Sequence, residues 1–582
     1  MDHDGLGLLH IAACCVLIPG ILAFFWRDPS RRRSCLPPGP PGELLLGHLR
    51  VIPKSGTAIA YANWSREYKS DVIYLKSLGQ PIVVLNSTEA AVQLLGRRAT
   101  NYSDRPRFTL FEVMGWGATL TFLPFGPQWR MHRKLLQANL SPSKIRQWHG
   151  LQVQESRRAA ASMLAHDGTW NATLKRFSVA IVLMVSYGIQ IDTDDDEYVK
   201  IANDALYVTG NGGLPAGSIV DLFPLARYLP DWLVRDWPLK FAREWGWAIR
   251  KLHDVPFAAV EAEVDDGIIR GSLAHALLRE YRSTKAQGMD RSFSLNDIKG
   301  ASGAIFIAGA DTTWATLVVF MLCMVLNPEV QEKAHAQLDS VLGPDRLPDF
   351  DDRPRLPYID LILQEVFRWA PLAPLGIPHK SLEDDIYKGM LIPRVGVVEN
   401  TGAPHIAADP PWITSVVVSS IVFANTHAMS RDERVYKDPA RFNPDRYNPL
   451  ADGTPGEPRP VAHFGFGRRQ STPVGVSPQG PCTHGRSQAK GVFEARKRRQ
   501  FSMRLLAFGV LGFVAARVRS CVGQFLADNS CWMAMATVLA AFRIDKKHDE
   551  QGRIVEPTVK FTNGGTWSDR AVELLGATLS KG

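Results

Sequence analysis

The chain has 582 residues, of which 45% are hydrophobic and 21% are charged, and this composition excludes an intrinsically disordered protein. The formal net charge is +9, but residues 470–520 contribute nine Lys or Arg against one acid, so the remainder is close to neutral. The charge therefore does not indicate a nucleic-acid-binding face. Seven cysteines form no secreted disulfide framework, which agrees with a reducing compartment.

The first predicted element is a transmembrane anchor over residues 5–26. This stretch is almost entirely apolar and, as a helix, is about as long as the hydrocarbon core of a bilayer is thick. Positive charge follows it at residues 27–33, whereas a cleaved signal peptide carries its charge before the apolar run. We therefore expect a retained anchor with the rest of the chain in the cytosol. Residues 27–42, basic and then proline-rich, are predicted to be a stiff hinge.

A small sheet is predicted soon after the hinge. Residues 72–75 and 82–85 are rich in β-branched and aromatic side chains, and a Gly79-Gln80-Pro81 turn joins them. Two such segments at this spacing predict a strand pair.

Trp129 and Arg133 are the first candidate site residues. Gly126-Pro127 predicts the start of a helix on which the two side chains, four residues apart, project from one face. By itself the pattern fits a core tryptophan beside a surface arginine as well as a binding pair.

A long apolar helix is predicted from Ala304 to Met324, interrupted by polar residues in Ala308-Gly309-Ala310-Asp311-Thr312-Thr313. An unpaired buried carboxylate costs on the order of several kcal/mol, so this polarity needs compensation. The small residues can open a groove for dioxygen and water. Thr312 can hydrogen-bond the helix backbone and bound oxygen, while Asp311 can relay protons from solvent. The alternative is a core helix with a local kink.

Glu365 and Arg368 lie three residues apart on a helix predicted to start near Tyr358. Exposed pairs of this kind contribute little to stability. The apolar flanks indicate a buried pair that needs a third partner, for which Arg446 is the candidate.

A glycine-rich turn, Phe464 to Arg469, is separated from Cys521-Val522-Gly523 by residues 470–520. Glycines let backbone amides approach a cysteine sulfur, and a helix N-terminus stabilises the sulfur as a thiolate. Iron bound to such a sulfur receives strong electron donation, which favours O-O cleavage. Without the interruption, the two halves read as a haem-thiolate loop.

In this order, the motifs resemble those of the cytochrome P-450 family, of the microsomal kind abundant in fungi, over nearly the whole chain. The resemblance implies a cytochrome P-450 fold, mainly α with a small β lobe, as one catalytic domain over residues 43–582. It implies one haem b, dioxygen as oxidant, and electrons from NADPH through a membrane-bound reductase. We expect a monooxygenase of the endoplasmic reticulum membrane that hydroxylates or epoxidises a small apolar molecule.

The resemblance also assigns roles to individual residues. Cys521 is the expected axial ligand of the haem iron, and Asp311 and Thr312 are the expected catalytic pair. The expected cofactor-binding residues, mainly at the haem propionates, are Trp129, Arg133, His379, Arg469 and Phe464. The expected structural cluster is Glu365, Arg368 and Arg446.

The expected substrate-cavity lining comes from residues 105–125, 206–222, 305–306, 372–377 and 562–565, by analogy with the family's recognition segments. The sequence names neither substrate nor pathway. Secondary metabolism and xenobiotic oxidation are both open.

Residues 395–420 and 470–520 interrupt otherwise well-matched motifs, and both differ in composition from their surroundings. We predict that they are retained introns, because a valine codon at the start and a serine codon at the end of the first segment suit splice borders. The alternative is a genuine insertion, with the basic run 496–499 and the apolar stretch 505–518 forming a membrane or partner element.

Three further alternatives remain open at the sequence level. Cys482 is a rival iron ligand, although it is not part of a Cys-x-Gly pattern. The interrupted loop could leave an inactive, haem-free membrane protein. A reductase-independent haem-thiolate isomerase is the third, although it would not need the proton delivery that Asp311 and Thr312 suggest.

Overall fold

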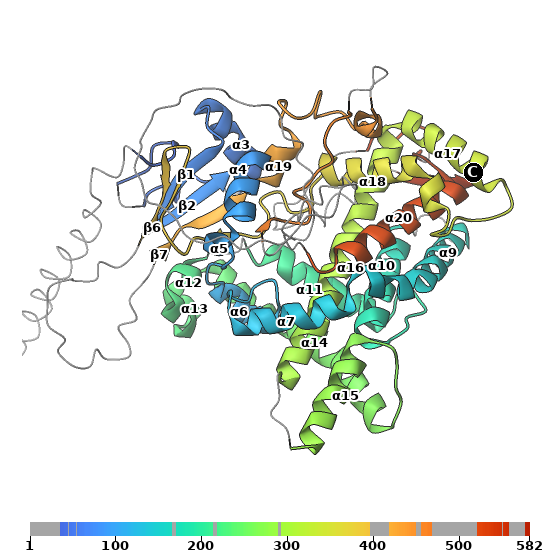
Figure 1. Ribbon diagram of the computed structural model, residues 1–582, viewed down its shortest axis with the longest axis horizontal. Helices are drawn as coiled ribbons and strands as arrows, with labels where there is room; N and C mark the ends of the chain where they lie inside the picture. The colour runs from blue at the N-terminus through green and yellow to red at the C-terminus, as the bar shows by residue number, and fades with distance from the viewer. Residues whose placement is uncertain are drawn as a thin grey trace, which may run out of the picture.

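The computed structural model describes residues 35–44, 46–53, 55–165, 170–213, 218–288, 293–395, 418–449, 455–467, 521–549, 551–557 and 577–581. The predicted anchor and the first half of the predicted hinge lie outside them, as do Arg469, Cys482 and almost all of both interrupting segments. The described part is mainly helical with small sheets, as expected for the predicted fold class (Figure 1).

The helices fall into an N-terminal and a C-terminal series. The first comprises α3 (Thr57–Glu67), α4 (Thr88–Ala91), α5 (Ala99–Tyr102), α6 (Thr109–Met114), α7 (Pro127–Asn139), α8 (Pro142–Ile145), α9 (His149–Ala165), α10 (Trp170–Tyr187) and α11 (Glu197–Asn211). The second comprises α12 (Ile219–Leu222), α13 (Asp231–Val234), α14 (Trp237–Asp265), α15 (Leu273–Ala286), α16 (Leu295–Leu326), α17 (Pro328–Leu342), α18 (Pro357–Trp369), α19 (Thr426–Ser430) and α20 (Gln524–Ala541).

The largest described sheet has the order β1-β2-β8-β3, formed by β1 (Val72–Ser77), β2 (Gln80–Leu85), β8 (Ile421–Ala424) and β3 (His379–Lys380). The predicted strand pair is confirmed: β1 and β2 are antiparallel, with Val72 opposite Leu85. The turn lies at Leu78-Gly79, where both residues have positive φ, so it begins one residue earlier than predicted. Strand β8 pairs parallel with β2 and antiparallel with β3.

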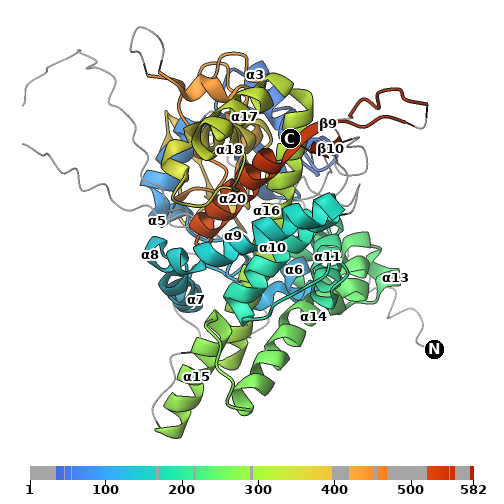
Figure 2. The same cartoon turned by 90° about the vertical axis from the view of Figure 1, so that its right-hand side faces the viewer.

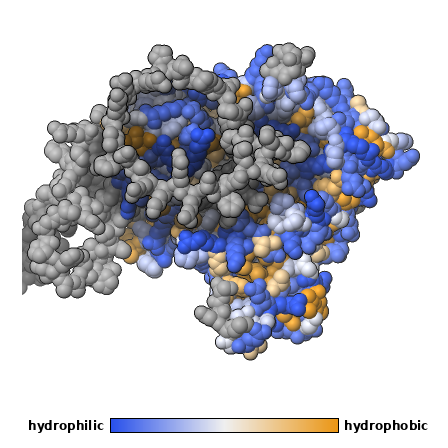
Figure 3. Space-filling view, in the orientation of Figure 1, coloured by the Kyte–Doolittle hydropathy of each residue, from blue (hydrophilic) through white to orange (hydrophobic). Residues whose placement is uncertain are grey.

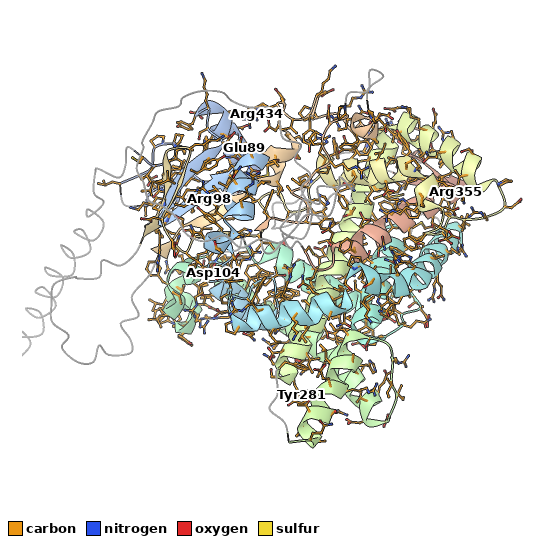
Figure 4. The ribbon with its side chains drawn as sticks, viewed as in Figure 1. Glu89, Arg98, Asp104, Tyr281, Arg355 and Arg434 are labelled. Carbon is orange, nitrogen blue, oxygen red and sulfur yellow. The ribbon has the colours of Figure 1, made fainter. Side chains whose placement is uncertain are left out.

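The sheet lobe also carries ion pairs between segments far apart in sequence. Figure 4 shows Glu89, Arg98 and Arg434 on this lobe. Arg98 lies 2.6 Å from Asp385, and Arg434 lies 2.9 Å from Asp71. Three further two-stranded sheets are described: β4 (Asp385–Tyr387) with β5 (Met390–Ile392), β6 (Arg394–Val395) with β7 (Val418–Ser419), and β9 (Phe542–Lys546) with β10 (Ala577–Lys581).

Helix α16 forms the centre of the helical lobe. It packs against α10, α14, α15, α18 and α20, and Figure 2 shows α20 beside it. Ser294 caps its start in a capping box with Asp297. A helix that is hydrophobic all round must be buried, and α16 is long and apolar enough to cross a membrane yet lies mostly inside the protein. The helix predicted over 304–324 is thus part of a longer helix, which is continuous through the polar segment Ala308–Thr313.

The interruption at residues 395–420 begins and ends at neighbouring points of the fold. Arg394 is paired with Ser419, and Val395 with Val418. Strand β8 then follows directly and completes the main sheet. Residues 395, 418 and 419 of the segment itself make this pairing, so the two ends of the segment lie side by side.

The surface is mostly hydrophilic on the face shown in Figure 3, with hydrophobic side chains gathered in its lower part, where α14 and α15 lie in Figure 1. A set of exposed large apolar side chains lies on α12, α13, the turn between them and the start of α14. It comprises Ile219, Phe223, Leu225, Tyr228, Leu229, Trp232, Leu233 and Trp237. We call this set the α12–α14 apolar surface.

Candidate functional site

A cavity of about 360 Å³ lies between α7, α10, α16, the end of α18 and the start of α20. Cys521, Phe464, Trp129, Arg133, His379 and Thr312 all line its wall. These residues come from five separate segments of the sequence, so the fold brings most of the predicted site residues to one place.

Cys521 lies two residues before the N-cap of α20, and the backbone amides of Gly523 and Gln524 hydrogen-bond its sulfur. Burial raises the pKa of the Cys521 thiol, while the amides of Gly523 and Gln524 and the positive charge of Arg133 lower it. The residue has exposed surface. Cys521 lines the cavity, so part of its exposed surface faces the cavity. The helix N-terminus, the two backbone amides and the Arg133 charge all favour a thiolate at this position.

The first half of the split loop reaches the same cavity. Phe464, Gly465 and Phe466 line the cavity wall together with Cys521. Gly467 has φ +78°, and a Cβ there would lie 2.3 Å from the Leu95 carbonyl oxygen, so no other residue fits without displacing backbone. The structure thus brings the two halves of the loop to one cavity although 51 residues separate them in the sequence.

Phe464 is held in place by a small aromatic cluster. Its ring lies 5.5 Å from the ring of Phe367 in α18, edge to face. His463 stacks on Phe367 with ring centroids 4.3 Å apart, and burial lowers the pKa of His463 to about 3, so its ring is neutral. The loop is therefore attached to α18 by ring contacts.

Trp129 and Arg133 lie on α7 and are both almost fully buried. The guanidinium carbon of Arg133 lies 5.9 Å from the Trp129 ring centre, and both side chains line the cavity, as a helix spacing of four predicts. His379 in β3 reaches the cavity from the sheet lobe. Its Nδ1–H donates to the Tyr102 carbonyl oxygen at 2.7 Å, which fixes the ring orientation.

The polar segment of α16 is divided between cavity and interior. Thr312 lines the cavity with Ala308 and Gly309, and its hydroxyl donates to the Ala308 carbonyl oxygen at 2.7 Å. Asp311 is buried and is not part of the described cavity wall. Successive residues of a helix point about 100° apart, and in α16 the step from Thr312 to Thr313 stays on the cavity wall whereas the step back to Asp311 leaves it.

Glu365, Arg368 and Arg446 form one buried ion cluster away from the cavity wall. Glu365 lies 2.7 Å from Arg368 and 3.0 Å from Arg446, and Tyr447 donates to it at 2.7 Å. Arg368 also donates to the carbonyl oxygens of Ser430 and Pro439, both at 2.8 Å. Each charge in the cluster therefore has protein partners, as a buried ion pair requires.

The cavity lining agrees only in part with the sequence analysis. Residues 105, 120, 121, 305, 372, 373, 376 and 377 line it as expected. Phe306 does not, because its ring packs inward near Tyr187, and no described residue of 206–222 reaches the wall. Residues 562–565 lie outside the described residues. The lining from α10, which includes Ser178, Ile181 and Val182, was not predicted.

Two polar arrangements near the cavity were also missed. Arg105 donates to the carbonyl oxygens of Ile377 and Pro378 at 2.6 and 2.7 Å and so fastens the 371–377 segment. His132 and Asp297 form a buried pair between α7 and α16. Gln128 and His132 lie four apart, but their partner is more than 160 residues away in the sequence.

A mainly helical domain whose cavity presents a cysteine at a helix start, opposite a threonine-bearing core helix, has the features of a haem-thiolate oxidoreductase. The family model described as Cytochrome P-450 matches residues 37–398 and 418–470. The chain belongs to the cytochrome P-450 family, and it is a monooxygenase. The matched stretches leave out residues 399–417 and end at 470, so Cys521 lies beyond them.

Curated relatives extend this similarity over most of the chain. A cytochrome P-450 monooxygenase of Armillaria gallica is 30% identical over 95% of this chain and 94% of the relative. Cytochrome P-450 monooxygenase 98 of Postia placenta is 32% identical over 93% and 89%, respectively. A tryptamine 4-monooxygenase of Psilocybe cyanescens is 28% identical over 92% and 91%.

Membership of this family implies a haem held by a cysteine thiolate, and the residues present fit that group. The cavity wall offers a sulfur at a helix N-terminus, a buried arginine beside a tryptophan, and a helix segment of small residues. On that segment, a Cβ at Gly309 would lie 2.3 Å from Val182 Cγ1, so the helices approach closely there.

Proposed function

We propose that this protein is a membrane-anchored monooxygenase of the endoplasmic reticulum that inserts one oxygen atom of O₂ into a small apolar molecule, by hydroxylation or epoxidation. Its electrons come from NADPH through a membrane-bound reductase, and its setting is secondary metabolism or xenobiotic oxidation. The observation that carries the proposal is that Cys521, Phe464 and Thr312 line one cavity.

Each site residue has a distinct task in this proposal. Haem, when bound, supplies the binding and reductive activation of dioxygen. Cys521 would hold the haem iron through its sulfur, and the Gly523 and Gln524 amides would stabilise the negative charge of that thiolate. Arg133, Trp129, His379 and Arg469 bind the propionates, with Arg133 supplying charge.

Thr312 is the proton-handling group on the cavity wall. Its hydroxyl already donates to the Ala308 carbonyl, so its oxygen lone pairs remain to accept a hydrogen bond from water or from a protonated oxygen group. Asp311, one residue earlier and buried, is the proton source behind it. In this proposal a proton passes first from Asp311 and then by way of Thr312.

The cavity chemistry favours a neutral substrate. Its described lining is mostly aliphatic and aromatic, and its charged side chains are Arg105 and Arg133, with no Asp or Glu. A protonated amine would therefore find no carboxylate on the described wall. The name of the Psilocybe relative specifies tryptamine, a cation at neutral pH, and the wall described here does not support that substrate class.

Membrane attachment is proposed from the apolar stretch at residues 5–26 and is supported by the α12–α14 apolar surface. Exposed Trp and Tyr side chains of this kind favour a membrane–water interface. Deleting residues 1–26 should release most of the protein from phospholipid vesicles. Undiminished binding after the deletion would contradict the anchor.

We further propose that residues 395–420 and 470–520 are retained introns. In support, the family match omits 399–417 and ends at 470, β6 pairs directly with β7, and both halves of the split loop reach one cavity. Mature transcripts that carry both segments in frame would contradict this and favour a genuine insertion.

The function is tested by a paired carbon monoxide difference spectrum. The full chain and a chain without residues 395–420 and 470–520 are expressed in microsomes with a reductase. A thiolate-type Soret band in the shortened chain, with NADPH-dependent oxygenation of an apolar substrate, supports the proposal. Absence of the band from both chains would contradict it, and turnover without NADPH would favour an isomerase.

A further inference from the structure

Two successive pairs of residues on α7 face two different environments. Trp129 and Arg133 line the cavity, whereas Gln128 and His132, each one position earlier, contact Asp297. Neighbouring helix positions point about 100° apart, so the two pairs define the rotation of α7 about its own axis. Fixing one pair therefore fixes the direction of the other.

The contacts at Asp297 are strong and buried. His132 has no exposed side-chain surface, and its Nε2 lies 2.9 Å from Asp297 Oδ1, while Gln128 Nε2 donates to the same oxygen at 3.1 Å. Although burial raises the pKa of Asp297, hydrogen bonds from His132, Ser294 and Gln128 lower it to about 2. The carboxylate is therefore charged and accepts strong hydrogen bonds.

Asp297 also belongs to the capping box of α16. Its Oδ2 accepts from the Ser294 amide at 2.9 Å and from the Ser294 hydroxyl at 2.7 Å. The same carboxylate therefore connects the start of the helix that carries Thr312 to the helix that carries Arg133.

We propose that His132 and Asp297 form a positioning pair that sets the rotation of α7 against α16 and so directs Trp129 and Arg133 toward the haem. This inference rests on the proposed function, in which those two residues bind propionates. His132 does not reach the cavity wall and acts only through its neighbours. Partners that orient a ligand-binding side chain without contacting the ligand typically change affinity about 10- to 100-fold when removed.

The test compares three variants of the purified haem protein. His132→Leu removes the donor, whereas His132→Gln keeps an amide donor near the position of Nε2. His275→Leu is the matched control, because His275 is equally buried and its Nε2 lies 3.1 Å from Glu263, but neither residue lines the cavity. The measured quantities are the rate of haem transfer to excess apomyoglobin and the midpoint of urea unfolding.

His132→Leu should release haem about tenfold faster than wild type, with His132→Gln within about threefold. His275→Leu should lower the urea midpoint without accelerating haem release. Should His132→Leu fail to fold, Gln128→Ala, which truncates an exposed side chain, should still accelerate release measurably.

Haem release from His132→Leu at the wild-type rate would overturn the inference, and so would equal acceleration in His275→Leu, which would indicate general destabilisation. If neither the 582-residue chain nor the chain without residues 395–420 and 470–520 took up haem, the proposed function would be overturned together with this inference. The wild-type spectrum is therefore recorded first.

Discussion

The ion cluster around Glu365 and the wall of the cavity both contain buried arginines, but they use them in opposite ways. Glu365 contacts Arg368, Arg446 and Tyr447, so its charge is balanced inside the protein. Arg133, Thr312 and Cys521 instead face a cavity. The comparison teaches that the cluster stabilises the fold, whereas the wall acts on a bound group.

The largest effect is expected from Glu365→Gln. The change keeps the side-chain volume but leaves two buried guanidinium groups without their shared carboxylate, so the free energy of unfolding should fall by about 3–5 kcal/mol. Urea titration measures it. The control is Glu43→Gln, in an exposed pair with Arg50 at 3.0 Å, where the loss should stay below about 1 kcal/mol. Equal losses in both variants would remove the distinction between the cluster and an ordinary ion pair.

Thr312→Val tests the role of the cavity wall. Valine has nearly the same shape but no hydroxyl, so product formation should fall on the order of 10²-fold while haem content and urea midpoint stay unchanged. Thr316→Val is the matched control, because Thr316 also lines the cavity and donates to the carbonyl four residues earlier, at 2.8 Å. Wild-type turnover in Thr312→Val would show that the hydroxyl has no role in proton transfer.

Asp221 offers a third arrangement, a largely buried carboxylate that accepts from the Leu110 and Ser218 amides rather than from a cation. Burial raises the pKa of Asp221 to about 7, against the lowering effect of these amides. The folded protein binds the Asp221 proton more tightly than the unfolded chain does, so protonation of Asp221 stabilises the fold. This contribution to the free energy of unfolding is complete below about pH 4 and is lost as the pH rises through about 7.

The expected change at Asp221 is the smallest of the three. Between pH 5 and 6, the free energy of unfolding of wild type should fall by up to about 1.4 kcal/mol relative to Asp221→Asn, which cannot titrate. Urea titrations of both proteins at the two pH values measure the difference. A pH-independent difference would mean that the amides, and not burial, dominate at this carboxylate.

A local pattern was sufficient to predict the β1–β2 pair, because two strands and their turn form a short motif. The mainly helical fold and a common site for Cys521, Phe464 and Thr312 were expected from the resemblance of the ordered motifs to the cytochrome P-450 family. Asp311 was paired with Thr312 in the same groove, and the helical rotation between neighbours separates them. The hydrogen bonds of Asp297 and Arg105 were missed because their partners lie far away in the chain. Phe306 was wrongly placed on the cavity wall, because periodicity alone does not tell which neighbour a buried helix face meets.

The central claim is that Cys521 binds the haem iron although residues 470–520 separate it from the rest of its loop. The direct measurement is the ferrous carbon monoxide spectrum of the 582-residue chain beside Cys521→Ser and Cys482→Ser. The thiolate-type Soret band should be present in the wild type and in Cys482→Ser and absent from Cys521→Ser. A band that survives in Cys521→Ser, or that disappears in Cys482→Ser, would contradict the assignment.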